Sequence, residues 1–135
     1  MLVCRASGFF FMGKQVVEKE LKFDLPWPPS INRYYRTFQG RMLISKDGRK
    51  YRARVAKELE GVEQMPGRLA VEIHAFPPDR RRRDLDNIQK SLLDSIEHAG
   101  VIEDDSNVDY LLTIRKRIVQ DGNVTVHIRQ FCPEE

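Results

Sequence analysis

The sequence predicts a single small α+β domain, in which one mixed or antiparallel β-sheet packs against about two helices. Four segments have the composition of β-strands, and two others repeat apolar residues at helical spacing. Their order along the chain is strand, loop, helix, strand, helix, strand, strand. The 135 residues suffice for one domain that buries its own hydrophobic core.

The first expected strand covers residues 19–25, where apolar and polar residues alternate. The second covers 69–76, with Leu69, Val71 and Ile73 on one face and Glu72 and His74 on the other. The last two are expected over residues 108–119 and 123–130. We expect them to pair as a hairpin, because Asp121-Gly122 between them is a typical hairpin turn.

The first expected helix covers residues 49–60, after a turn or cap at 45–48, and places Tyr51, Val55 and Leu59 on one face. The second covers 84–98 and ends before Gly100. Its apolar face is formed by Leu85, Ile88, Leu92 and Ile96.

The remaining segments have no regular pattern. Pro26, Pro28 and Pro29 predict a rigid extended turn, because proline lacks the backbone N–H that helices and sheets need. We expect residues 31–44 to form a surface loop or ribbon. Residues 1–17 are expected to be an N-terminal extension, disordered or loosely packed, and residues 18–135 the folded domain.

The composition excludes several classes of protein. No apolar run reaches the ~18 residues of a membrane helix, so we expect no membrane partner. The two cysteines are too few for a disulfide framework, and no Cys/His cluster has zinc spacing. We therefore expect reduced cysteines and a cytoplasmic protein.

Charge is strongly segregated along the chain. Residues 29–83 contain 14 lysines and arginines against 6 acidic residues, whereas residues 84–110 contain 8 acidic residues against one lysine. The basic segment, residues 29–83, suits binding to phosphates. If the carboxylates of the acidic segment hold a cation, that segment would attract phosphates as well. Two solvated faces of opposite sign that pair with each other explain the segregation equally well.

The segment DRRRRDLDNIQK at residues 79–90 contains most of the candidate catalytic residues. Four arginines precede Asp84 and Asp86 at the start of the second helix, where Asp86, Lys90 and Asp94 share one outward face. A second acidic cluster follows at residues 103–105. Carboxylates in this arrangement suit Mg²⁺, and a nearby lysine can stabilise charge that develops on a phosphate.

Each part of this segment also has a structural explanation. Asp84 can be an N-cap, Asp86 can favour the helix dipole, and Lys90 can be an exposed partner of Asp86. The arginines can be a solvated charge run, and residues 103–105 a plain turn. The interpretation as a nuclease rests on finding phosphate-binding residues, metal-binding acids and a charge stabiliser together.

Aromatic and basic residues are interleaved between residues 27 and 41. This mixture suits nucleic acid, because rings stack on bases while guanidinium groups bind phosphates. Trp27 in particular is expected in the core instead. The other members of the mixture are Tyr34, Tyr35, Phe38, Arg33, Arg36 and Arg41.

Four motifs resemble the RusA family of Holliday junction resolvases. They are LPWPPSINRYYR at residues 25–36, SKDGRKYR at 45–52, PDRRRRDLDNIQKSLLDSIEHAG at 78–100 and EDDSNVDY at 103–110. The resemblance covers roughly residues 19–130. It implies a small homodimeric endodeoxyribonuclease, often carried by phages and prophages, that uses Mg²⁺, with Mn²⁺ as a substitute. The implied partner is branched DNA in a bacterial cell, with no nucleotide cofactor.

The resemblance also implies the roles of individual residues. Asp84, Asp86 and Asp105 would bind the metal, and Lys90 would complete the catalytic set. Which of Glu103, Asp104 and Asp105 binds metal stays open, and we favour Asp105 by its distance from the DLD motif. The expected DNA contacts, among which Arg83 stands out, are Arg80, Arg81, Arg82, Arg83, Asn32, Arg33, Tyr35, Arg36, Lys46, Arg49, Lys50 and Arg52.

The function expected from these residues is resolution of Holliday junctions by paired symmetric nicks in four-way DNA, during recombination and repair. Two rival functions remain. One is a non-catalytic module that binds junctions or other DNA, and the other is a nuclease for other branched DNA. A role in protein contacts alone fits the arginine run poorly.

Overall fold

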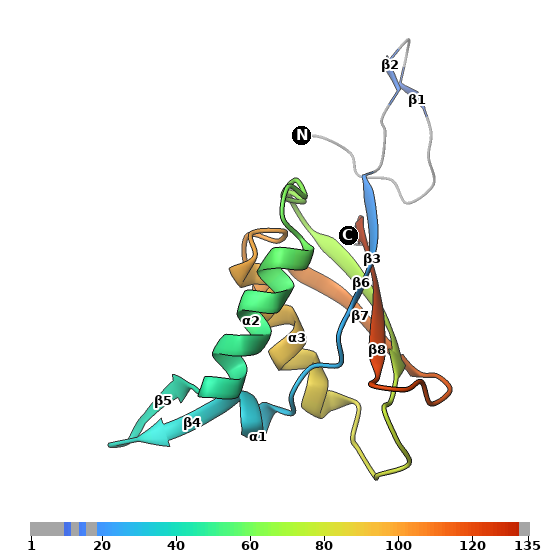
Figure 1. The fold of residues 1–135 in the computed structure, drawn as a ribbon. Coiled ribbons are helices and arrows are strands. Elements are labelled where there is room, and N and C mark those ends of the chain that lie inside the picture. Colours follow the sequence, from blue (N-terminus) through green and yellow to red (C-terminus); the bar gives the residue numbers. More distant parts are fainter. Residues whose placement is uncertain (1–9, 12–13, 16–18, 133–135) are drawn as a thin grey trace.

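The computed structural model describes residues 10–11, 14–15 and 19–132 of the chain (Figure 1). Its centre is a four-stranded sheet of order β3-β8-β6-β7, in which β6 and β7 are parallel and the other pairs antiparallel. The strands are β3 (Glu20–Leu25), β6 (Leu69–Phe76), β7 (Val108–Arg115) and β8 (Asn123–Gln130). The predicted α+β class with a mixed sheet is confirmed.

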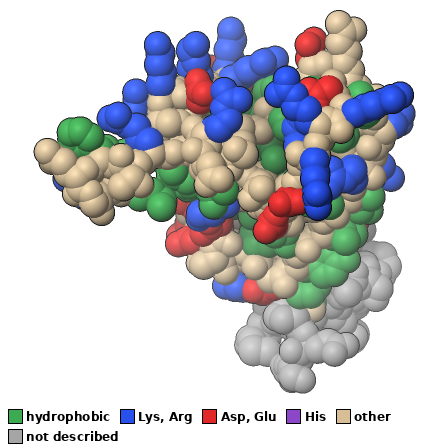
Figure 2. All heavy atoms as spheres, turned by 90° about the horizontal axis from the view of Figure 1, so that it is seen from below, with side chains coloured by type: hydrophobic (Ala, Val, Ile, Leu, Met, Phe, Trp, Pro, Cys, Tyr) green, Lys and Arg blue, Asp and Glu red, His purple; other side chains and the backbone are tan. Residues whose placement is uncertain are grey.

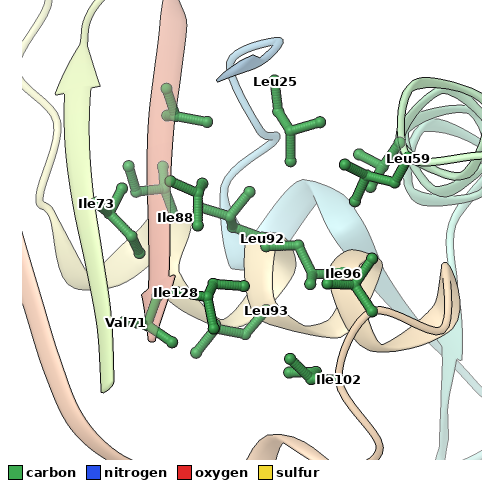
Figure 3. Packing of buried hydrophobic residues seen from close by; sticks show 14 of the residues in the cluster. Leu25, Leu59, Val71, Ile73, Ile88, Leu92, Leu93, Ile96, Ile102 and Ile128 are labelled. Carbon is green, nitrogen blue, oxygen red and sulfur yellow. The ribbon is translucent and has the colours of Figure 1, made fainter. Parts of the chain in front are cut away.

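Two helices cover one face of this sheet, α2 (Lys46–Glu58) and α3 (Asp86–His98) (Figure 1). The buried side chains of β6 and β8 alternate along the strands and meet the apolar faces of both helices (Figure 3). Val71 and Ile73, predicted on one face of the strand, are fully buried in this layer together with Leu92 and Ile96 of α3. Burial of such side chains, worth about 1.5–3 kcal/mol each, fixes α3 on the sheet.

The predicted hairpin of the last two strands is wrong. β6 lies between β7 and β8, and β7 ends at Arg115 instead of residue 119. The backbone N–H groups of Lys116 and Val119 donate to Ala75 and Pro77, so the chain follows the end of β6 before it turns back. Asp121 and Gly122 do have positive φ angles, as predicted for a turn. The turn, however, connects β7 to β8 on the other side of β6, so the two strands do not pair.

The connection through α3 explains this order. A helix between β6 and β7 makes a β-α-β unit, whose strands pair in parallel in one sheet. This pairing places β7 at the edge of the sheet and leaves the other side of β6 to β8.

A small second layer is formed by the segment predicted as a loop or ribbon. It contains one helical turn, α1 (Ile31–Tyr34), and a hairpin of β4 (Tyr35–Phe38) and β5 (Arg41–Ile44) that projects from the body (Figure 1). The turn between the strands, Gln39-Gly40, has positive φ at both residues, as tight hairpin turns require. The ribbon prediction is therefore confirmed.

The two helices begin at positions slightly different from the predicted ones. α2 starts three residues early, because the Ser45 side chain accepts a hydrogen bond of 2.9 Å from the Gly48 N–H and caps the helix. α3 starts at Asp86 and leaves Asp84 just before it.

Three expectations concern the rest of the chain. Within residues 1–17 the structure describes only the short strands β1 (Phe10–Phe11) and β2 (Lys14–Gln15), and the other residues of the expected extension lie outside the described part. Cys132 is disulfide-bonded, so the expectation of reduced cysteines is wrong for this residue. The helices of the described part are too short and polar to cross a membrane.

Candidate active site

The two aspartates of the DLD motif lie where the loop after β6 enters α3. Asp84 does not cap the helix with its side chain, since the cap position is Leu85 and no side-chain cap bond forms. The Asp84 carbonyl instead accepts a hydrogen bond of 3.2 Å from the Asn87 N–H. Asp84 and Asp86 are exposed, and within the described residues neither carboxylate pairs with another side chain. Both are free to bind a cation.

Lys90 lies one helical turn after Asp86 and joins α3 to the short helix η1 (Asp105–Asn107). Its ammonium nitrogen lies 2.6 Å from Oδ2 of Asp105. The hydrogen bond to Asp105 raises the pKa of Lys90, so the ammonium stays charged over the physiological range. The structure therefore brings together two of the predicted catalytic residues that lie far apart in the sequence.

Asp105 belongs to a group of acids that the sequence predicted only in part. Carboxylate oxygens of Glu97, Asp104 and Asp105 lie within 4.8 Å of one another. In the described part of the chain, Asp84 and Asp86 do not join Asp105 in a group of that spacing, and Glu103 is exposed outside it.

Glu97 was missed by the sequence analysis. It lies eleven residues, or about three helical turns, after Asp86 and hence on the same face of α3. Its Oε1 accepts a hydrogen bond of 2.7 Å from the Asp105 N–H, so it fixes the start of η1. The spacing along the helix was the available signal, but the contact with Asp105 depends on the tertiary fold.

Asp94, the last acid of the predicted row on α3, has structural partners. Its Oδ2 accepts a hydrogen bond from the buried Tyr34 hydroxyl and lies 2.7 Å from Nη2 of Arg52. The Arg52 Nε also donates to the Tyr34 hydroxyl, at 2.7 Å. This Tyr34–Asp94–Arg52 network joins α1, α2 and α3.

The network sets the ionisation of its members. Burial opposes the charge of Asp94, but the hydrogen bonds from Tyr34 and Arg52 outweigh it and lower the pKa of this carboxyl. Burial and the bond to Asp94 raise the pKa of Tyr34 to about 12. Arg52, predicted as a DNA contact, therefore uses its guanidinium within the protein.

In the loop of four arginines before the DLD motif, Arg81 and Arg83 both pair with Asp79. The Asp79 carboxylate accepts hydrogen bonds from Arg83 Nη1 at 2.6 Å and from the Arg81 N–H at 2.9 Å. The bond from Arg83 lowers the pKa of Asp79 to about 2. Arg83 lies over the indole ring of Trp27, 5.9 Å from its centroid, while Arg80 and Arg82 are exposed.

The other predicted DNA contacts lie on α1, the hairpin and the first half of α2. Lysine and arginine side chains gather on the face shown in Figure 2, with few acidic groups between them. Arg33 pairs with Asp47 at 3.2 Å, and Arg49 donates to the Ile44 carbonyl. Tyr35 is half-buried, whereas the remaining predicted contacts on these elements are exposed, namely Asn32, Arg36, Lys46 and Lys50.

A groove lies between the proline segment, α2 and the arginine loop. Its volume is about 940 Å³, and Asp84 lies on its lining. Trp27 was expected in the core, and it does pack against the core while also lining this groove.

The comparisons with known proteins agree with the motifs. The family model described as Endodeoxyribonuclease RusA matches residues 26–129. The chain is 41% identical over 115 residues to the crossover junction endodeoxyribonuclease RusA of Enterobacteria phage HK97, covering 83% of this chain and 96% of the relative. It is 40% identical to that of Enterobacteria phage 82, over 82% and 94% of the two chains, and 39% identical to that of Escherichia coli K12, with the same coverage. The fold, the motifs and these matches together place the chain in the RusA family of endodeoxyribonucleases.

Proposed function

We propose that the protein is a Holliday junction resolvase, a Mg²⁺-dependent endodeoxyribonuclease that makes paired symmetric nicks in four-way DNA junctions. The observation that carries this proposal is the ion pair of Lys90 with Asp105, one helical turn after Asp86, whose carboxylate pairs with no other side chain in the described part of the chain. Relatives at about 40% identity over most of the chain carry the name crossover junction endodeoxyribonuclease. Recombination and repair are the processes that present such junctions.

The donor set fits a hard divalent cation. Exposed carboxylate oxygens are the ligands that Mg²⁺ prefers, and it is commonly held by one or two carboxylates together with substrate phosphate. Asp84 and Asp86 would hold it, with Asp105 as the third acid of the proposed site. Bound Mg²⁺ would neutralise charge on the phosphate and activate water, and Mn²⁺ would replace it.

The chain's own residues perform the remaining tasks. The exposed arginines Arg80 and Arg82 bind phosphates, while Arg83 is held in place by Asp79. The Lys90 ammonium stabilises negative charge that develops on the cleaved phosphate, from a position set by Asp105. The other predicted contacts on α1, the hairpin and α2, apart from Arg52, hold the arms of the junction.

Paired nicks require two active sites, so we propose a homodimer whose two-fold axis matches that of the junction. β7 supports this arrangement, since it is an edge strand that exposes apolar side chains. Tyr110 and Leu111 of β7 are each 39% exposed, and Ile118, three residues after the end of the strand, is 47% exposed. Sedimentation equilibrium tests the proposal, and a single-chain mass at micromolar concentration contradicts it.

We place the activity in the domain of residues 18–135 and in the bacterial cytoplasm, where the DNA of the cell or of a prophage is accessible. The family match to residues 26–129 supports this domain. No nucleotide cofactor is needed, because hydrolysis of a phosphodiester requires only water and the site described.

A cleavage assay tests the proposed function. A synthetic four-way junction and a linear duplex with the same arm sequence are incubated with Mg²⁺, with Mn²⁺ and with EDTA, using the wild-type protein and Asp86→Asn. Symmetric cuts in the junction alone, lost with EDTA and in the variant, support a resolvase. Tight junction binding without cuts favours the non-catalytic module. Faster cutting of flaps or three-way junctions favours a nuclease for other branched DNA.

A further inference from the structure

The groove beside Asp84 has rigid walls. The Tyr51 hydroxyl donates a hydrogen bond of 2.7 Å to the Pro26 carbonyl, and the Ser91 hydroxyl donates one of 2.6 Å to the Pro29 carbonyl. These bonds fasten the proline segment to α2 and α3. Trp27 is confined as well, since a Cβ on Gly122 would lie 2.8 Å from the Trp27 Cβ. The shape of the groove is therefore formed before any ligand arrives.

Two kinds of surface line this groove. One is apolar and is supplied by Trp27 together with Pro28, Pro29 and Pro78. The other is cationic and is supplied by side chains of α1, α2 and the arginine loop, namely Arg33, Lys50, Arg54, Arg81, Arg82 and Arg83. Arg83 joins the two surfaces, because its guanidinium lies over the indole ring.

We propose that this groove binds unpaired nucleotides of the DNA strand next to the cleaved phosphate, with bases against Trp27 and phosphates on Lys50 and Arg54. The inference rests on the proposed function and names the form of DNA that the site selects. A duplex hides the faces of its bases within the stack and offers only phosphates. An apolar lining with an aromatic ring beside cations suits a strand whose bases are exposed.

The position of the groove supports this assignment. Asp84 lines it, so a strand in the groove continues directly to the proposed metal-binding acids. A volume of about 940 Å³ lies at the upper end of the ~300–1,000 Å³ range of small-ligand sites, and so suits a short stretch of strand. In a four-way junction the strands exchange at the branch point, which is where base pairs open most easily.

Trp27 is the single tryptophan of the chain, so its emission reports on the groove alone. The test titrates the full chain in EDTA, where cleavage is prevented, with an oligothymidylate of about eight nucleotides, within the usual site size of single-strand binding folds. A blunt duplex of the same length is the comparison. We expect saturable quenching by the single strand and at least fivefold weaker quenching by the duplex.

Two matched variants of α2 separate the groove from general charge. Arg54 lines the groove, whereas Lys57 is exposed on the same helix outside it. We expect Arg54→Ala to weaken binding of the single strand at least threefold and Lys57→Ala to leave it unchanged. Trp27→Leu, followed by anisotropy of a labelled oligothymidylate, should weaken binding by about fivefold or more, the loss expected for one stacked base.

The outcomes distinguish this inference from the proposed function. Absence of quenching, equal quenching by duplex, or equal losses in the Arg54 and Lys57 variants overturns the inference, even if junctions are cleaved with Mg²⁺. Quenching by the single strand without any junction cleavage retains the groove as a single-strand site and overturns the proposed resolvase.

Discussion

Lys90 of α3 and Asp105 of η1 form an ion pair of 2.6 Å that links the DLD helix to the acidic loop after it. Asp105 is at the same time within 4.8 Å of Glu97 and Asp104. Lys90, which lies one helical turn after Asp86, thus neutralises part of this dense acidic group. A lysine in this place both limits repulsion among carboxylates and presents a cation to an incoming phosphate.

Asp86→Asn is expected to abolish cleavage and to preserve binding of the junction. The variant removes one anionic ligand of the proposed metal site but no contact within the protein, because the Asp86 side chain pairs with no described residue. Cleavage of a labelled junction and its Kd in Ca²⁺ measure the two effects separately. The thermal unfolding midpoint should stay within about 1 °C, since surface substitutions without contacts change stability little. Cleavage at the wild-type rate would contradict the proposed metal site.

Lys90→Ala is expected to slow cleavage by about 100-fold or more, the loss typical of removing one preorganised charge stabiliser. Junction affinity should change by less than about threefold, because one phosphate contact among many contributes little to binding. Single-turnover cleavage rates and gel-shift Kd values measure the two quantities. Equal losses in both would make Lys90 a DNA-binding residue.

The same variant separates a charge effect from a structural one. Removing the ammonium leaves Asp105 without its counter-ion, so the acidic group should bind Mn²⁺ more tightly in Lys90→Ala than in the wild type. Electron paramagnetic resonance titration of free Mn²⁺ measures this affinity without any cleavage. The control is Lys57→Ala, which removes an exposed lysine of α2. Unchanged Mn²⁺ affinity in Lys90→Ala would contradict this prediction and show that the Lys90 charge does not oppose metal binding.

Junction binding should weaken steeply with salt, because exposed arginines and lysines displace cations from the phosphates. Arg82→Ala, which changes an exposed side chain of the groove lining, should lower the slope of log Kd against log salt by about one. Arg68→Ala is the control, since Arg68 pairs with Asp109 away from the groove. An equal change in both slopes would indicate an effect of net charge alone.

The sequence predicted those parts of the site that depend on local spacing. The helical repeat placed Asp86, Lys90 and Asp94 on one face of α3, and the resemblance favoured Asp105, which pairs with Lys90. Contacts between elements that are distant in the sequence could not be predicted from it. A charged residue does not reveal its partner, so the pairing of Arg52 with Asp94 could not be predicted from the sequence. The hairpin signal at Asp121-Gly122 was local in the same way, and it carried no information about β6 between the two strands.

The Tyr34–Asp94–Arg52 network is expected to stabilise the fold, not to take part in cleavage. Tyr34→Phe removes the buried hydroxyl but leaves Asp94 paired with Arg52, so we expect a loss of about 1–2 kcal/mol in the free energy of unfolding. Urea denaturation measures this loss. Tyr35→Phe is the matched control, because the Tyr35 hydroxyl makes no hydrogen bond within the described residues. Equal free energies of unfolding in both variants would show that the network does not stabilise the fold.

The lowered pKa of Asp94 predicts how this stabilisation depends on pH. An aspartate whose pKa is lower in the folded than in the unfolded state stabilises the protein fully above the unfolded value of about 3.9, and the effect is lost as the pH falls through the folded value. The difference in unfolding free energy between the wild type and Asp94→Asn should therefore be largest near neutral pH and shrink below about pH 4. Asp79, whose pKa is about 2, is present in both proteins and cancels in this difference. Urea unfolding of both proteins from pH 7 to pH 3 checks the prediction, and a difference that grows toward low pH would contradict an ionised Asp94 in the folded protein.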